Sequence, residues 1–121
     1  MEGIEHMAKL LAILVADRER FSYIDRIANA PSIDSVLWYL REALRDFYSL
    51  KRMLRKMVAK GPTEEKLWKW MNEIDDNKVN IFLEKLSGIE DRIELRKTVS
   101  LLCGKALALA DRFMSELEKG E

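Results

Sequence analysis

Basic residues are concentrated in one segment of the chain. Residues 41–60 contain seven lysine or arginine residues and two acidic residues, Glu42 and Asp46, which gives this segment a charge of +5. The chain as a whole has 21 basic and 21 acidic residues, so the remaining residues together have a charge of −5. Four of the seven cations are arginines, whose planar guanidinium group can bind a phosphate through two parallel hydrogen bonds. The local excess therefore predicts a phosphate-binding surface that the net charge of zero conceals.

A helix through this segment places most of the cations on one side. At about 100° per residue, one arc contains Arg41, Arg45, Tyr48, Arg52, Arg55 and Lys56, and the opposite side contains Leu40, Leu44, Phe47, Leu50, Leu54 and Val58. We predict a nucleic-acid-binding basic stripe, which we define as Arg41, Arg45, Tyr48, Arg52, Arg55, Lys56 and Lys60. Such a stripe can follow a phosphate backbone without reading its sequence, and Tyr48 or Trp38 offers a surface on which a base can stack. The alternative is the ordinary charged outer face of a surface helix.

Residues that commonly perform catalysis or bind metals are few and scattered. The single histidine, His6, has no second histidine as a partner, and we interpret it as a solvated helix residue. The single cysteine, Cys103, lies at helical spacing with apolar residues and is interpreted as a small buried side chain. The pairs Asp75-Asp76 and Glu90-Asp91 are typical of helix starts, and no glycine-rich phosphate loop is present. We therefore expect no enzyme, no catalytic residue, no metal site and no cofactor.

The elements that must position these residues are helices. The chain is 48% hydrophobic and 35% charged with only 5 glycines and 2 prolines, which favours an all-α fold. Its 121 residues fit a single helical domain over 1–121. Apolar periodicity predicts a compact bundle of five to six helices, over about residues 4–19, 22–29, 32–60, 63–74, 77–86 and 89–117. We expect the long helices 32–60 and 89–117 to be antiparallel partners.

Particular residues mark the ends and the core faces of these helices. Ser32 is a suitable N-cap for the third helix, Gly61-Pro62 is a strong stop, and Thr63 suits the N-cap of the next helix. The last helix has an apolar seam that we expect to face the core, formed by Ile93, Val99, Leu102, Cys103, Ala106, Ala110, Phe113 and Leu117. Trp70 is expected in the core, whereas Trp68 and Trp38 can lie either at the core or in an interface.

The remaining features concern the compartment. A single cysteine excludes an intramolecular disulfide and favours a reducing, cytoplasmic location. No segment reaches the roughly 18 apolar residues that would span a bilayer, and residues 1–6 lack the basic start of a signal peptide. The absence of glutamine, together with many charged residues, favours a thermophilic source.

Two short segments resemble a known family. The run Tyr23-Ile-Asp-Arg-Ile-Ala-Asn-Ala30, followed by Leu40-Arg-Glu-Ala-Leu-Arg-Asp46, resembles the small subunit of the archaeal type I-A CRISPR interference complex, a Cascade-like effector. The resemblance extends over about residues 10–55. It implies a non-catalytic subunit that assembles with other CRISPR effector subunits and with copies of itself in antiviral defence. It also implies backbone contacts with the guide RNA–target DNA hybrid or the displaced DNA strand that stabilise the R-loop, while guide pairing supplies the specificity.

Two other functions fit the same residues. A helical protein–protein adaptor or a self-associating bundle needs no nucleic-acid role, and its stripe is merely solvated surface. A small transcription factor fits less well, because the predicted third helix is too long for a helix-turn-helix recognition helix.

Overall fold

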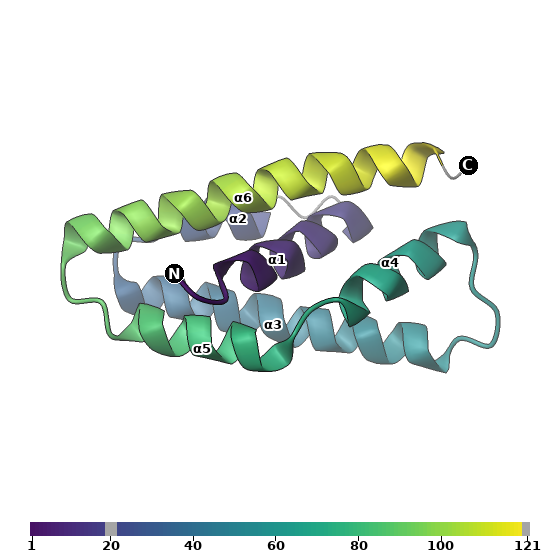
Figure 1. Cartoon of the computed structure of the whole chain (residues 1–121), viewed down its shortest axis with the longest axis horizontal. Coiled ribbons are helices and arrows are strands. Elements are labelled where there is room, and N and C mark those ends of the chain that lie inside the picture. Colours follow the sequence, from purple (N-terminus) through teal and green to yellow (C-terminus); the bar gives the residue numbers. More distant parts are fainter. Residues whose placement is uncertain (19–21, 120–121) are drawn as a thin grey trace.

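The structure is a computed structural model that describes residues 1–18 and 22–119. These residues form an elongated bundle of α-helices with no strand (Figure 1). The six helices are α1 Ile4–Arg18, α2 Ser22–Ala28, α3 Ile33–Lys56, α4 Pro62–Asn72, α5 Asp76–Ser87 and α6 Arg92–Lys119. The prediction of an all-α helical bundle is confirmed.

Helix α1 lies in the centre of the bundle, and its middle is buried on all sides. The run from Leu10 to Val15 is apolar without interruption, and every one of its residues is at most 3% exposed. A helix that is apolar all round can only be stable where other elements cover each face. In α1 that cover comes mainly from α6, with α3, α4 and α5 on its other sides (Figure 1).

The direction of the two long helices differs from the prediction. In Figure 1, α1, α3 and α6 all run from left to right, whereas α2, α4 and α5 run in the opposite direction. The expected antiparallel pairing of α3 with α6 is therefore wrong, since the two helices are parallel and α1 lies between them. The reason is that α4 and α5 continue in one direction after a break at residues 73–75, so together they form a single return element.

The connection between α3 and α4 also departs from expectation. Ser32 is the N-cap of α3 as predicted, and its Oγ accepts a hydrogen bond of 3.2 Å from the Ser35 N–H. Helix α3 ends at Lys56 rather than Lys60, because Met57 turns into extended backbone and packs its side chain against the core. Gly61, not Thr63, is the N-cap of α4, with Pro62 in the first turn. Proline suits that position, since its fixed φ is already helical and its missing N–H would have no partner there.

Acidic residues begin the last two helices. Asp75 caps α5 by accepting a hydrogen bond of 2.9 Å from the Asn77 N–H. Asp91 accepts a bond of the same length from the Ile93 N–H, and α6 begins at Arg92 rather than at residue 89. Ile93 lies about half a turn around α6 from the buried Leu102 and is 67% exposed, so its predicted place in the core is wrong.

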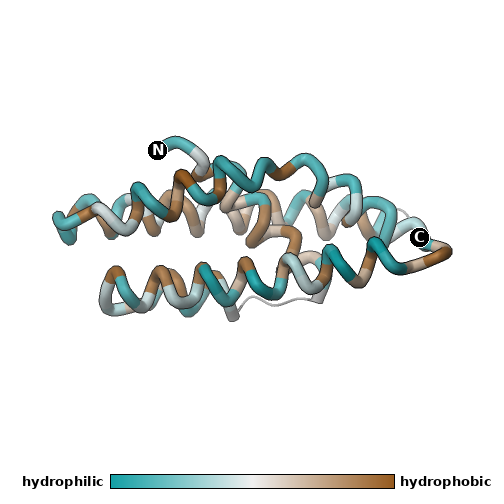
Figure 2. The backbone as a smooth tube through the Cα atoms, turned by 90° about the horizontal axis from the view of Figure 1, so that it is seen from below, coloured by the Kyte–Doolittle hydropathy of each residue, from teal (hydrophilic) through white to brown (hydrophobic). Residues whose placement is uncertain are grey.

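The core consists of the inner faces of all six helices. Figure 2 shows hydrophobic and hydrophilic residues alternating along the outer helices, as expected where one face is buried. The rings of Trp70 and Phe113 stack with their centroids 4.1 Å apart, which joins α4 to α6 and confirms Trp70 as a core residue. Within residues 1–17 and 23–119, no polar or charged residue is buried. None of the helices described is both long enough and apolar enough to cross a membrane.

Candidate nucleic-acid interface

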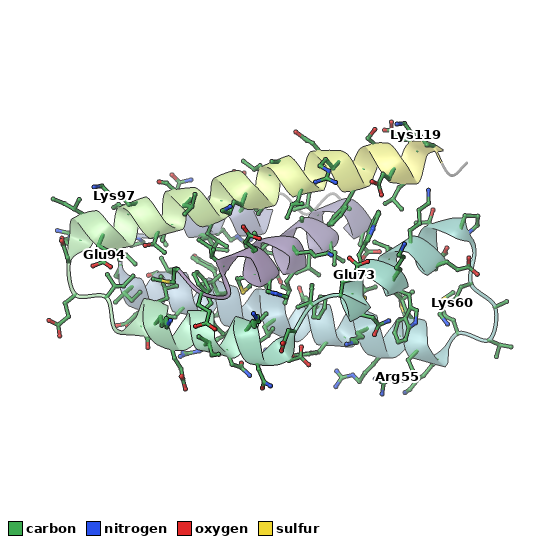
Figure 3. All side chains as sticks on the ribbon, viewed as in Figure 1. Arg55, Lys60, Glu73, Glu94, Lys97 and Lys119 are labelled. Carbon is green, nitrogen blue, oxygen red and sulfur yellow. The ribbon has the colours of Figure 1, made fainter. Side chains whose placement is uncertain are left out.

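Helix α3 turns its apolar face inward and its cations outward. Its buried residues are Val36, Leu37, Leu40, Ala43, Phe47, Leu50 and Leu54. The cations of the basic stripe that lie within α3, namely Arg41, Arg45, Arg52, Arg55 and Lys56, are all exposed. In Figure 3, Arg55 points away from the bundle on the side of α3 remote from α6. The helical arrangement of these five cations is therefore as the sequence predicted.

Local contacts hold two of these arginines only loosely. Arg45 Nη1 lies 3.3 Å from Glu42 Oε1, one turn earlier on the same helix, and its side chain remains 74% exposed. Exposed pairs of this kind are worth roughly 0.3–0.5 kcal/mol, so the guanidinium can exchange partners at little cost. Arg52 Nη2 donates a hydrogen bond of 3.3 Å to Ser49 Oγ, also within one turn.

The C-terminal half of α3 forms one wall of a small surface pocket. Tyr48, Lys51, Arg52 and Arg55 line it from α3, and Asp76 lines it from the first turn of α5. We call this cavity of about 310 Å³ the Tyr48 pocket. Three cations and one carboxylate leave it with an excess of positive charge, which suits an oxygen-rich anionic group such as a phosphate.

Tyr48 is a half-buried part of this wall rather than an open stacking surface. One edge of its ring packs against Phe47, with centroids 5.7 Å apart and planes inclined at 63°. Burial raises the pKa of Tyr48, and the charge of Asp76 and a hydrogen bond to its carboxylate raise that pKa further. The phenol therefore stays protonated at neutral pH and donates its hydrogen bond to Asp76.

Trp38 is the exposed aromatic residue near the basic stripe. It is 58% exposed, and its ring contacts Tyr39 edge-on at a centroid distance of 5.3 Å. It lies one helical turn before Arg41 on α3. Its exposure places Trp38 on the surface and not in the core. Of the two stacking surfaces that the sequence offers, Trp38 is the more accessible.

Lys60 is separated from the other members of the stripe. It lies in the connection after α3, and its Nζ is 5.4 Å from the centroid of the Trp68 ring (Figure 3). Trp68 is itself half-buried and packs at the margin of the core. This cation–π contact sets the position of Lys60. The sequence had placed Lys60 on the stripe by assuming that the helix continues for four more residues beyond Lys56. The same early end of α3 leaves Val58 fully exposed instead of on the apolar face.

Sequence reasoning did not assign two residues of the Tyr48 pocket to the site. Lys51 was counted as part of the local charge, but the wheel placed it outside the basic arc. Asp76 is 28 positions after Tyr48 in the chain, and only the return of α4 and α5 beside α3 brings the two together. The predicted helix start at Asp75-Asp76 was the available signal, but no spacing rule could say which helix it would meet.

The single histidine and cysteine have structural roles. His6 Nδ1 accepts a hydrogen bond of 3.1 Å from the backbone N–H of Asp75, so His6 anchors the start of α5 to α1 and is not merely solvated. Cys103 is buried, as predicted, and burial raises its pKa from 9.0 to about 11. In the part of the chain that the structure describes, no three His, Cys, Asp or Glu residues are grouped so that they could hold a metal ion.

The chain is similar in sequence to an archaeal protein over almost its whole length. No family model matches the chain, and no solved structure matches it. An uncharacterized protein of the archaeon Archaeoglobus fulgidus is 36% identical over 108 residues, which cover 89% of this chain and 88% of that protein. Identity at this level over almost the full length of both proteins shows common descent. The chain therefore belongs to the same family as this archaeal protein.

Proposed function

We propose that this chain is a non-catalytic small subunit of an RNA-guided CRISPR effector complex, in which α3 contacts a nucleic-acid backbone. The main support is the row of five exposed cations from Arg41 to Lys56, which ends beside the Tyr48 pocket. The fifteen helical steps from Arg41 to Lys56 span about 22 Å, the length of about six phosphates at the duplex spacing of about 3.4 Å. A row of this length can hold a strand in place without reading its bases.

The resemblance to CRISPR small subunits supplies the setting, and its two segments are adjacent in space. Residues 23–30 lie mainly in α2 and residues 40–46 lie in α3, and these two helices pack against each other. The Tyr23 hydroxyl donates a hydrogen bond to the Asp46 carboxylate, so the first segment is tied to the second. Arg41 and Arg45 belong to the second segment. This arrangement supports the interpretation of the two segments as one unit whose outer side presents the first cations of the stripe.

The charge balance is consistent with binding inside an assembly. Because the net charge is zero, the rest of the molecule repels a polyanion about as strongly as the 41–60 segment attracts it at long range. Neighbouring subunits that deliver the nucleic acid to α3 would remove this difficulty. In this role the chain positions a strand, and base pairing with the guide selects it.

A salt titration of binding to labelled single-stranded DNA, single-stranded RNA and an RNA–DNA hybrid tests the proposal. The test variant has Arg41, Arg45, Arg52 and Arg55 changed to Glu. The matched control has Arg26, Arg92, Arg112 and Lys119 changed to Glu, which alters the net charge equally at four exposed positions on other helices. Circular dichroism checks that both variants keep their helices.

We expect the wild-type affinity to fall with salt and the test variant to lose that dependence. Each lost phosphate contact on a single strand removes about 0.7 from the slope of log K against log salt, so four contacts remove about 3. If the control loses as much affinity as the test variant, net charge and not α3 is responsible. If no substrate gives a salt slope, the nucleic-acid role is wrong and the adaptor function is favoured. CRISPR genes beside the gene for this chain would independently support the proposed complex.

A further inference from the structure

The outer side of α6 has an apolar seam that no part of the described chain covers. Apart from Ile93 near its start, the large apolar residues of α6 are buried or half-buried except for Leu101, which is 49% exposed, and Leu107, which is 42% exposed. Together with the exposed Ser100, Gly104 and Ala108 they lie within about 60° on either side of Gly104 around the helix. We call this surface, with Lys97 and Asp111 at its two ends, the outer α6 seam. It lies on the opposite side of the bundle from the basic stripe, since Lys97 and Arg55 point away in opposite directions (Figure 3).

Gly104 at the centre of this seam has no explanation within the chain. Glycine in a helix interior costs about 1 kcal/mol relative to alanine. A Cβ built on Gly104 would meet no atom within 4 Å. Close packing within the chain therefore does not require glycine here, and neither does the backbone conformation. Glycine in such a place permits the backbone of another element to approach closely. The approaching element must then come from outside the chain.

The charges at the ends of the seam point to a second copy of the same chain. Lys97 is seven residues before Gly104 and Asp111 is seven residues after it, about 10 Å along the helix in each direction. If two α6 helices pack antiparallel about a two-fold axis at Gly104, Lys97 of each copy lies against Asp111 of the other. Leu101 then meets Leu107 of the second copy, and each of these contacts forms twice. Parallel packing would instead place Lys97 against Lys97 and Asp111 against Asp111.

We infer that the outer α6 seam is a homodimer interface in which two copies pack antiparallel across Gly104. The contact is limited to the middle of one helix, so the dimer is expected to be weak and to dissociate on dilution. Because the two basic stripes face away from the shared axis, the dimer leaves both free for other contacts. The inference uses no residue of the basic stripe and does not depend on the proposed function.

Charge exchange at the ends of the seam tests both the interface and its orientation. Sedimentation velocity of the full chain from about 1 µM to about 1 mM should give a dimer whose fraction rises with concentration. Lys97→Asp alone places two carboxylates together at each end, and Asp111→Lys alone places two ammonium groups together, so each should weaken dimerisation about tenfold. A mixture of the two single variants restores both ion pairs and should form a heterodimer at wild-type concentrations.

Gly104→Leu is the steric test. The open space around Gly104 means that the substitution should leave the fold intact and raise the melting temperature through better helix propensity, while it abolishes the dimer. Arg112→Asp serves as a control for charge on the same helix, since Arg112 is exposed but lies outside the seam. The inference is overturned if the wild type stays monomeric at about 1 mM, if Gly104→Leu dimerises normally, or if the mixture stays monomeric.

Discussion

Replacing Asp76 by asparagine is expected to strengthen nucleic-acid binding, whereas most substitutions at a binding surface weaken it. Asp76 is the only acidic residue among the side chains that line the Tyr48 pocket, beside Lys51, Arg52 and Arg55. Its carboxylate repels any phosphate that enters. Asparagine has nearly the same shape and can still accept the hydrogen bond of the Tyr48 hydroxyl, so the pocket should keep its form.

The size of the effect follows from the dimensions of the pocket. A phosphate that fills this cavity of about 310 Å³ lies on the order of 4 Å from the Asp76 carboxylate, the usual separation of a contacting charge pair. Two unit charges at about 4 Å interact by about 1 kcal/mol in water, which corresponds to about a fivefold gain in affinity when the repulsion is removed. The cost to the fold is small, because Asp75 and not Asp76 caps α5. Losing a first-turn carboxylate should lower the free energy of unfolding by only about 0.5 kcal/mol.

Fluorescence anisotropy with a labelled single strand at constant salt measures this gain. Glu84→Gln is the matched control, since it removes the same charge from an exposed position on the same helix. It lies about 12 Å further along α5, beyond the screening length of about 8 Å at physiological salt. Asp76→Asn should also lower the pKa of Tyr48, because both contributions of Asp76 disappear and only burial still raises that pKa. The difference in tyrosinate absorbance between Asp76→Asn and Asp76→Asn with Tyr48→Phe reports it.

Unchanged or weaker binding by Asp76→Asn would refute the assignment of the Tyr48 pocket as a phosphate site, provided that the pKa of Tyr48 falls as expected. That second readout is important because it demonstrates that the substitution has removed the Asp76 charge from beside Tyr48. An equal gain from Glu84→Gln would attribute the effect to net charge instead.

Three further predictions concern single residues. Trp38→Ala should weaken single-strand binding by about 1–3 kcal/mol through the loss of one stacked base. Because Trp38 is 58% exposed, urea denaturation should show almost unchanged stability, and a large loss there would place its role in the fold. His6→Ala should lower the free energy of unfolding by about 1 kcal/mol because the Asp75 N–H loses its acceptor. His6→Asn, which keeps an acceptor, should recover part of that loss, and failure to do so would contradict the assigned bond. Since burial raises the pKa of Cys103 to about 11, the protonated thiol stabilises the fold below the unfolded pKa of 9.0, and this contribution is lost as the pH rises to about 11. Stability measured across that window should therefore decline more in the wild type than in Cys103→Ala, and equal declines would contradict the burial argument.

Local patterns predicted the helices well, because each helix forms from residues close together in the chain. The cap at Ser32, the break at Asp75 and the apolar face of α3 all follow from neighbouring residues. The predicted direction of α6 relative to α3 was wrong, because that direction depends on whether α4 and α5 reverse the chain once or twice. That is a matter of how two short helices pack, and the residues at the break do not determine it. The end of α3 was misplaced because Met57 gains more from the core than from another helical turn.

The candidate site was predictable only where one helix supplies it. The exposed arginines of α3 follow from a helical wheel, since their relation is local. Lys60 and Asp76 were not predictable in this way, because Trp68 fixes the first and the return of α5 fixes the second. The positions of Lys60 and Asp76 both depend on tertiary contacts. Such contacts decide which residues join the exposed arginines of α3 on one surface.

The burial of α1 affects how the protein must fold. Its main cover, α6, is the last helix in the chain, and the Glu5–Lys105 ion pair of 3.3 Å joins residues 100 positions apart. Most helical bundles fold quickly because their contacts are local, but here the central helix is covered only after a loop of that length closes. During synthesis α1 must remain exposed, with its apolar run uncovered, until α6 has been made. We expect slow folding for a helical protein of this size, and aggregation of any nascent chain that stops before α6.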